Sequence, residues 1–214
     1  MNNRNFQIMI SGVIKLKPSI WQIVLILAAS IIVSCDQERA KYENTQVTPT
    51  PMPTIMTTKQ SVPVFENLRN QALNVKSGDL QIKVSEKDTV VYGVVMDWDM
   101  PEGVATLIAF STGDASLYNS KGGGTIGGIG HQKIQSAAKY LTSSAVTYLK
   151  NAKQVETTPL PPKDCVGFYL LTNKGKFYLE EKMEAMEQQS SPIFGLFEDA
   201  NKVITELIAV SGTT

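Results

Sequence analysis

Apolar residues recur at helical spacing in three segments of the chain between residues 61 and 210. The first segment opens with Ser61 and Pro63, residues that favour a helix N-terminus, and ends at the turn signal Ser77-Gly78. The last segment opens in the same way, with Ser191 and Pro192. The spacing therefore predicts helices over residues 61–77, 132–152 and 191–210.

Extended apolar runs separated by turn residues predict strands in the rest of this region. The first run is apolar at both alternate sets of positions, which is typical of a central strand covered on both faces. Asn173-Lys174-Gly175 marks a hairpin turn between the last two runs. The expected strands are Thr89–Trp98, Val104–Ser111, Ala115–Asn119, Cys165–Thr172 and Lys176–Glu180.

These elements follow one another in the order α-β-β-β-α-β-β-α. The order predicts an α+β fold in which about five antiparallel strands are flanked by helices. Its order and size resemble the roadblock, profilin-like and PAS-like sandwiches. Roadblock domains place two strands before the middle helix and three after it, whereas we expect three and then two, closer to the PAS-like variation. The resemblance carries no functional residue over to this chain.

The N-terminus has the pattern of an export signal. The run Ile20–Ser34 holds apolar or small residues broken only by Gln22, and Lys15 and Lys17 precede it. A membrane-spanning helix needs roughly 20 apolar residues, so this shorter run is typical of the apolar part of a signal peptide. Met9 is a second candidate start that would give a signal of ordinary length.

The run ends in Ile32-Val33-Ser34-Cys35, which resembles the lipobox of bacterial lipoproteins. The resemblance implies cleavage between Ser34 and Cys35 and attachment of acyl chains such as palmitate at Cys35. An anchor of this kind is stable, because each buried CH₂ contributes about 0.8 kcal/mol. The alternative is an uncleaved anchor helix in which the cysteine is incidental.

Three regions are therefore expected. Residues 1–34 form a lipoprotein signal peptide, residues 35–60 comprise the lipidated cysteine and a disordered Thr/Pro-rich linker, and residues 61–214 form a single α+β domain. The expected location is the bacterial cell envelope, with the protein lipid-anchored to a membrane on the periplasmic side or at the cell surface.

The charge and the rare residue types narrow the choice of partner. The chain has 20 Lys and Arg and 20 Asp and Glu, a balance that gives no support to nucleic acid binding. Cys35 and Cys165 are the two cysteines and His131 is the single histidine, so no metal site and no cofactor is expected. Cys165 opens a strand without a base nearby and is expected to be buried and inert.

Residues 121–131 read KGGGTIGGIGH and lead into the second predicted helix. The spacing of their glycines matches G-x-G-x-x-G, but no acid follows at the distance that a dinucleotide ribose requires, and the lysine of a phosphate-binding P-loop is missing. An anion site at the helix N-terminus is one interpretation. A loop that needs glycine only for close backbone packing is the other. The anion-site residues would be Lys121, Gly122, Gly123, Gly124, Gly127, Gly128, His131 and Lys133.

His131 is also a candidate for general acid–base chemistry if the fold brings a carboxylate to it. Asp97 and Asp99 flank Trp98 near the end of a predicted strand, so both side chains are expected on one face. With Glu102 they would otherwise form a solvated acidic hairpin end. The sequence identifies no catalytic candidate beyond His131, Asp97 and Asp99.

Three hypotheses for function follow. The first is a non-enzymatic envelope lipoprotein whose domain binds another envelope protein or itself as a homodimer. The second is a periplasmic module that binds a small anionic ligand with the Gly122–His131 loop. The third is a hydrolase or transferase that uses His131 with Asp97 or Asp99.

Overall fold

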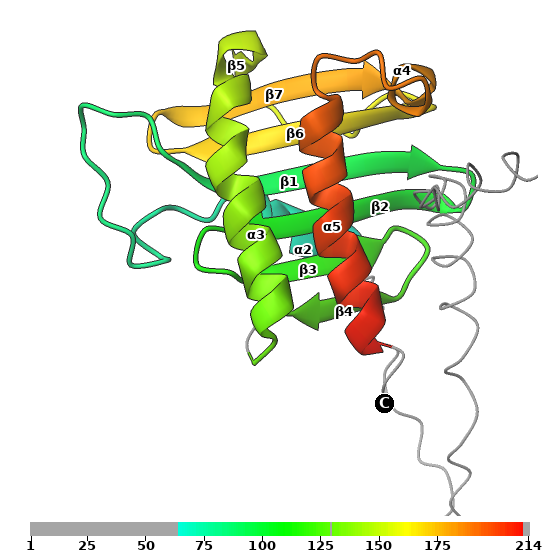
Figure 1. Ribbon diagram of the computed structural model, residues 1–214, viewed down its shortest axis with the longest axis horizontal. Helices are drawn as coiled ribbons and strands as arrows, with labels where there is room; N and C mark the ends of the chain where they lie inside the picture. The colour runs from blue at the N-terminus through cyan, green and yellow to red at the C-terminus, as the bar shows by residue number, and fades with distance from the viewer. Residues whose placement is uncertain (1–63, 129, 212–214) are drawn as a thin grey trace, which may run out of the picture. The chain divides into compact units, whose positions relative to one another are not determined.

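The computed structural model of the chain describes residues 64–128 and 130–211. The strands in this part form one antiparallel sheet of seven, with helices on both faces (Figure 1). In spatial order the sheet reads β4-β3-β2-β1-β6-β7-β5. The strands are β1 (Val91–Met100), β2 (Gly103–Phe110), β3 (Ala115–Asn119), β4 (Gly124–Gly127), β5 (Lys153–Val155), β6 (Cys165–Thr172) and β7 (Gly175–Lys182).

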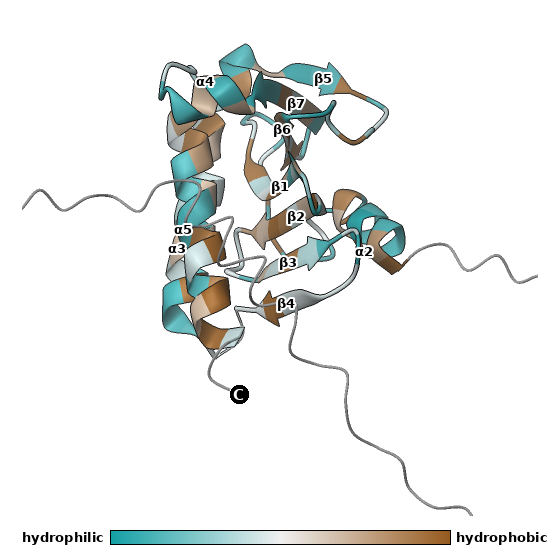
Figure 2. Ribbon diagram, turned by 90° about the vertical axis from the view of Figure 1, so that its right-hand side faces the viewer, coloured by the Kyte–Doolittle hydropathy of each residue, from teal (hydrophilic) through white to brown (hydrophobic). Residues whose placement is uncertain are grey.

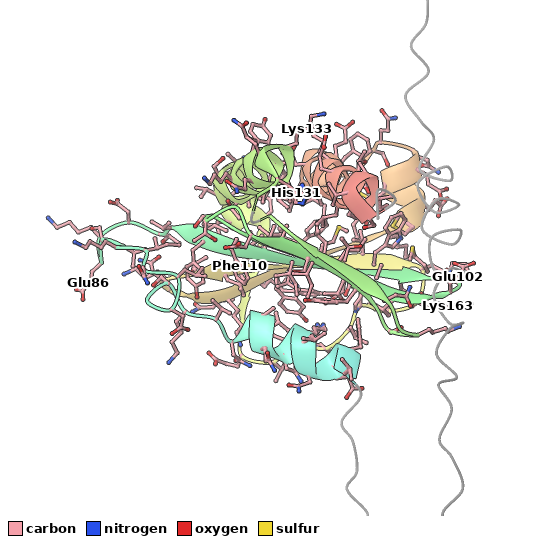
Figure 3. The ribbon with its side chains drawn as sticks, turned by 90° about the horizontal axis from the view of Figure 1, so that it is seen from below. Glu86, Glu102, Phe110, His131, Lys133 and Lys163 are labelled. Atoms are coloured by element: carbon pink, nitrogen blue, oxygen red, sulfur yellow. The ribbon has the colours of Figure 1, made fainter. Side chains whose placement is uncertain are left out.

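Two long helices cover one face of the sheet and a short helix covers the other (Figures 2 and 3). The pair on the first face consists of α3 and α5, and α2 lies on the opposite face. A 3₁₀ turn, η1, continues α3 to Asn151. The bounds are α2 (Val64–Leu73), α3 (Gln132–Ala145), η1 (Val146–Asn151), α4 (Met183–Glu187) and α5 (Phe194–Ser211).

The central strand β1 is buried on both faces because helices cover both faces. Toward α5, the ring of Trp98 packs edge-on against Phe197, with 5.4 Å between the ring centroids. Toward α2, a second cluster fills the space under the short helix. Its buried members are Ala72, Leu73, Tyr92, Val95, Ile108, Tyr169 and Leu171.

The structure confirms the α+β class, the antiparallel sheet and the central position of the first strand. β3 and β6 have the predicted bounds, and β1, β2 and β7 lie within two residues of theirs. The expected strand count of about five was too low. The observed order has four strands before α3 and three after it.

The two additional strands lack the pattern that sequence reasoning depends on. β4 reads GTIG, so it has only two side chains larger than hydrogen, and β5 is three residues long. Both are edge strands, which pair on one side only. The predicted helix over residues 132–152 changes to 3₁₀ geometry at Val146.

Candidate functional site

The outer edge of β4 is the most unusual surface of the described residues. Ile126, in the middle of this strand, has 77% of its surface exposed, more than any other large apolar residue in the part of the chain that the structure describes. Exposure alternates along β4, with Gly124 and Ile126 exposed and Thr125 and Gly127 half-buried. The strand therefore presents an apolar side chain at a sheet edge with which no other described strand pairs.

Backbone hydrogen bonds decide which groups of β4 point outward. Phe110 N donates to Asp114 O over 2.9 Å, and Asn119 N donates to Gly123 O over 3.2 Å. In an antiparallel ladder, residues alternate between pairs that exchange hydrogen bonds and pairs that do not. Asn119 and Gly123 form a hydrogen-bonded pair. Every second pair along the ladder is of the same kind, so Thr125, opposite Leu117, and Gly127, opposite Ala115, also bond inward to β3. The N–H and C=O groups of Gly124 and Ile126 therefore point away from the sheet.

The glycines around β4 have structural causes. Gly122, with φ +110°, closes the β3–β4 turn by accepting a left-handed backbone that other residues rarely adopt. A side chain at Gly127 would meet Leu207 at 2.8 Å and Ile134 at 3.0 Å, so glycine there lets α3 and α5 approach the sheet. The run of glycines thus builds a tight hairpin under two helices.

The structure does not bring the predicted anion-site residues together. Lys121, Gly122 and Gly123 form the β3–β4 turn, whereas Gly128 leads into α3 at the other end of the strand. A strand of four residues spans about 13 Å, at a rise of about 3.3 Å per residue. Gly124 and Gly127 belong to that strand and not to a loop. No single cradle can contain both groups.

His131 occupies the N-cap of α3 with φ −114° and ψ 92°, and its side chain makes no capping hydrogen bond. The ring is exposed, as is neighbouring Lys133. Figure 3 shows both on the α3 side of the sheet. Anion binding by this end of the set remains a prediction.

Neither predicted carboxylate lies near His131. Asp97 bonds to Arg69 of α2, so it lies on the opposite face of the sheet from α3. Asp99 pairs with Val104 at one end of β1, whereas His131 lies at the other end, where α3 packs against Gly113. The Asp99 carboxylate accepts a hydrogen bond from Asp164 N over 3.0 Å. The fold therefore separates the three catalytic candidates.

Asp97 is not part of a solvated acidic tip, since none of its surface is exposed. Arg69 binds it through two groups: Nη2 donates to Oδ2 over 2.7 Å, and Nε donates to Oδ2 over 3.0 Å. Thr106 Oγ1 donates to the other carboxylate oxygen over 2.6 Å. Partners on β2 and α2 thus satisfy the buried charge.

The same arginine holds the Pro-rich segment before β6. Its Nη1 donates to Thr158 O over 2.9 Å and its Nη2 to Pro159 O over 3.2 Å. Tyr169 donates to the same carbonyl, Pro159 O, over 2.5 Å, and the guanidinium carbon lies 5.5 Å from the Tyr169 ring centroid. This cluster fastens α2 and the Pro-rich segment to the sheet.

Burial controls the proton affinity of this cluster. It raises the pKa of Tyr169 to about 12, against the smaller opposing effect of the Arg69 charge. Burial, followed by the hydrogen bond to Glu180, also raises the pKa of Tyr178. For Arg69, burial lowers the pKa, but the hydrogen bond and the charge of Asp97 raise it, with a net rise. The two tyrosines are therefore neutral and the arginine is charged near pH 7.

Sequence reasoning missed Arg69, although a signal was present. Arg69 lies three and four residues before Ala72 and Leu73, so a helix places all three on one face. Asp97 interrupts an otherwise apolar central strand, and a buried acid requires a partner. The two observations together would have predicted the pair.

Cys165 is a free cysteine with 7% of its surface exposed, as predicted. Burial, and then the charge of Glu180, raise the pKa of its thiol, which keeps it in the unreactive protonated form. Among residues 64–128 and 130–211, no three His, Cys, Asp or Glu side chains gather as metal ligands would.

The predicted signal, with Ser34 and the lipidation site Cys35, lies outside the described residues. Within the part that the structure describes, no helix has the length and apolar character needed to span a membrane. No family model, no curated protein and no solved structure matches the chain. The resemblance to roadblock, profilin-like and PAS-like folds therefore stays a prediction.

Proposed function

We propose that this chain is a lipid-anchored protein of a bacterial envelope whose α+β domain binds another protein at the outer edge of β4. The anchor part of the proposal is supported by the Ile32–Cys35 lipobox and by the apolar run before it, which follows Lys15 and Lys17. The binding part is supported by one observation, the open and apolar β4 edge.

The two edges of the sheet differ in how they resist strand pairing. Natural edge strands are protected by charged residues, by proline or by very short length. β5 has three residues, and one of them is Lys153. β4 is also short, with four residues, but it has neither charge nor proline and exposes Ile126. Protection is therefore weaker at β4, which favours an edge kept open for a partner.

The geometry around β4 suits an added strand. The outward N–H and C=O groups of Gly124 and Ile126 can form four backbone hydrogen bonds with an extended segment, the mode called β-strand addition. The N-terminal end of α3 and the C-terminal end of α5 reach past β4 in both views (Figures 1 and 2). These helix ends would cover one face of the added strand.

Photo-crosslinking in the intact bacterium tests the binding part. A photoreactive phenylalanine replaces Lys121, exposed in the turn before β4, in one full-length chain and Tyr140, exposed on α3, in a control chain. We expect a crosslinked protein, identified by mass spectrometry, only from position 121. Ile126→Pro removes the outward N–H of an exposed edge position and should abolish that product without unfolding the domain.

A product from position 140 alone, or one that Ile126→Pro leaves unchanged, would exclude β4 as the binding edge. The anchor part has its own test, metabolic labelling with an alkyne-modified palmitate. The full-length chain should incorporate the label and partition into the membrane fraction, and Cys35→Ser should do neither. Label retained by the Cys35→Ser chain would contradict the proposed lipidation site.

The other two hypotheses gain no support from the arrangement of the residues. The predicted anion-site set is divided between the two ends of β4, and the fold separates His131 from Asp97 and Asp99. Both remain predictions, and neither is needed to explain the β4 edge.

A further inference from the structure

The β4 edge lies in a basic part of an otherwise balanced chain. No Asp or Glu occurs from Ala115 to Val155, while the whole chain has 20 acidic and 20 basic residues. Exposed lysines lie on both sides of the strand. Lys121 is in the turn before it and Lys133 is in the first turn of α3 after it. The exposed His131 lies beside Lys133.

Three acids on neighbouring elements moderate this charge. Glu102, in the β1–β2 turn, directly precedes Gly103, where an added Cβ would meet Lys121 Cγ at 3.2 Å. Asp114 lies in the β2–β3 turn, close to Gly128, and its carboxylate accepts a hydrogen bond from Thr112 over 2.7 Å. Glu206 is half-buried on α5. Lys121 and Lys133 are the nearest lysine, arginine or acidic residues before and after β4 in the sequence.

A second copy of the chain fits this edge poorly. The residues that extend beyond β4 have positive φ, +83° at Gly123 and +113° at Gly128, so only Gly124 to Gly127 can pair as a regular strand. An antiparallel pair of β4 strands centred on Thr125 would bring Lys121 of one copy toward the Lys133 end of the other, and like charges repel. The helix ends that overhang β4 in each copy would also meet (Figure 1).

We infer that the β4 edge binds an extended peptide segment of another protein that has a short β-branched core with acidic residues on both sides. This inference rests on the proposed function and names the chemistry of its partner. A core of four or five residues matches the length of β4, and its acidic flanks would then lie toward the β3–β4 turn that carries Lys121 at one end and toward the start of α3, with His131 and Lys133, at the other. β-Branched residues favour the extended backbone that pairing with β4 requires.

Peptide binding to the full-length chain in detergent tests the inference by fluorescence anisotropy. The probe peptide has a Val-Thr-Val-Thr core with two glutamates at each end. One comparison peptide carries lysines in place of the glutamates, and another carries proline in the core. We expect about tenfold tighter binding of the acidic peptide than of either comparison peptide, and weakening by salt, because the flanks contribute charge and the core contributes backbone hydrogen bonds.

Charge reversal on the protein provides the matched control. Lys121→Glu with Lys133→Glu should weaken binding of the acidic peptide about tenfold. Lys139→Glu with Lys150→Glu makes the same change in net charge at exposed positions of α3 and η1 away from the edge, and should change binding less than twofold.

The inference would be overturned if the acidic peptide failed to bind or bound no more tightly than the basic one. It would also be overturned if proline in the core left the affinity unchanged, or if both double variants lost affinity equally. If the photoreactive residue at position 121 crosslinks to a protein in cells but the acidic peptide does not bind, the proposed function stands and this partner chemistry is wrong. A crosslinked product that consists of two copies of the chain would overturn the inference in favour of self-association.

Discussion

Arg69 and Asp97 form an ion pair in which both side chains are almost fully buried, with 7% and 0% exposed. The pair also holds α2 and the Pro-rich segment in a defined position, because Arg69 donates to two carbonyls of that segment. Its net contribution to stability is smaller than its geometry suggests, since both charges lose water on burial. The cost of breaking it on one side is much larger.

Arg69→Met should therefore lower the free energy of unfolding by about 3–5 kcal/mol, because it leaves the Asp97 carboxylate buried without its cation. Urea unfolding followed by tryptophan fluorescence measures this. The double change Arg69→Met with Asp97→Leu should recover most of the loss, since neither charge then remains. A double variant as unstable as the single one would mean that the loss comes from Arg69's contacts with the Pro-rich segment.

Tyr169 predicts a pH dependence at the alkaline end. Its pKa is raised to about 12 in the folded chain, from an ordinary value of 10. The folded state thus holds the phenolic proton more tightly than the unfolded state, and this contribution to stability is complete below pH 10. Stability should fall as the pH rises from 10 to about 12. Tyr169→Phe should reduce that slope in urea unfolding series, and an unchanged slope would assign it to the other tyrosines.

For single residues, the sequence predicted the burial of some side chains and not of others. Cys165 was expected to be buried because it opens an apolar strand, and to be inert because no base lies near it in the sequence. The structure confirms the burial. Asp97 was expected in solvent because it is charged and close to a turn. Its partner Arg69 lies on a helix 28 positions earlier in the chain, so the pair becomes visible only when the patterns of two distant segments are combined.

Among the elements, β4 shows why glycine-rich strands escape prediction. Alternation of apolar and polar side chains is the usual signal for a strand, and GTIG has too few side chains to alternate. The strand forms because β3 supplies a template and because glycine allows the helices to approach. β1, with apolar residues at almost every position, was predicted within two residues at each end.

Gly127→Ala should lower the free energy of unfolding by about 1–3 kcal/mol, because the added methyl meets Leu207 and Ile134 at 3.0 Å or less in a packed core. Thermal unfolding followed by circular dichroism measures the change. Gly78→Ala is the matched control, since a Cβ there meets no atom within 4 Å. Equal melting temperatures for the two variants would contradict close packing of α3 and α5 on β4.

For the molecule as a whole, the unprotected β4 edge predicts limited solubility. An exposed apolar side chain on an edge strand favours irregular association with other chains, even where a regular pairing of two β4 strands is unfavourable, and an inserted lysine suppresses this association. Ile126→Lys should raise the concentration at which the full-length chain in detergent begins to aggregate, as light scattering reports. Its free energy of unfolding should change by no more than about 0.5 kcal/mol, because the side chain is exposed.

Tyr140→Lys, on the exposed face of α3, is the comparison for that variant. It removes a similar exposed apolar group away from any strand edge. Equal gains in solubility from both substitutions would attribute the aggregation to general surface hydrophobicity and not to the edge.

The position of α2 has a mechanical consequence. α2 is the first described element, so a pull on the chain before Val64 enters the domain through this helix. Arg69 lies one and a half turns further along and is bound at once to β1 and to the Pro-rich segment. Tension applied on the N-terminal side therefore acts on the contacts of the Arg69 guanidinium before it acts on the strands. Under enough force α2 would peel away first and uncover Tyr92 and Val95, while the seven strands stay paired.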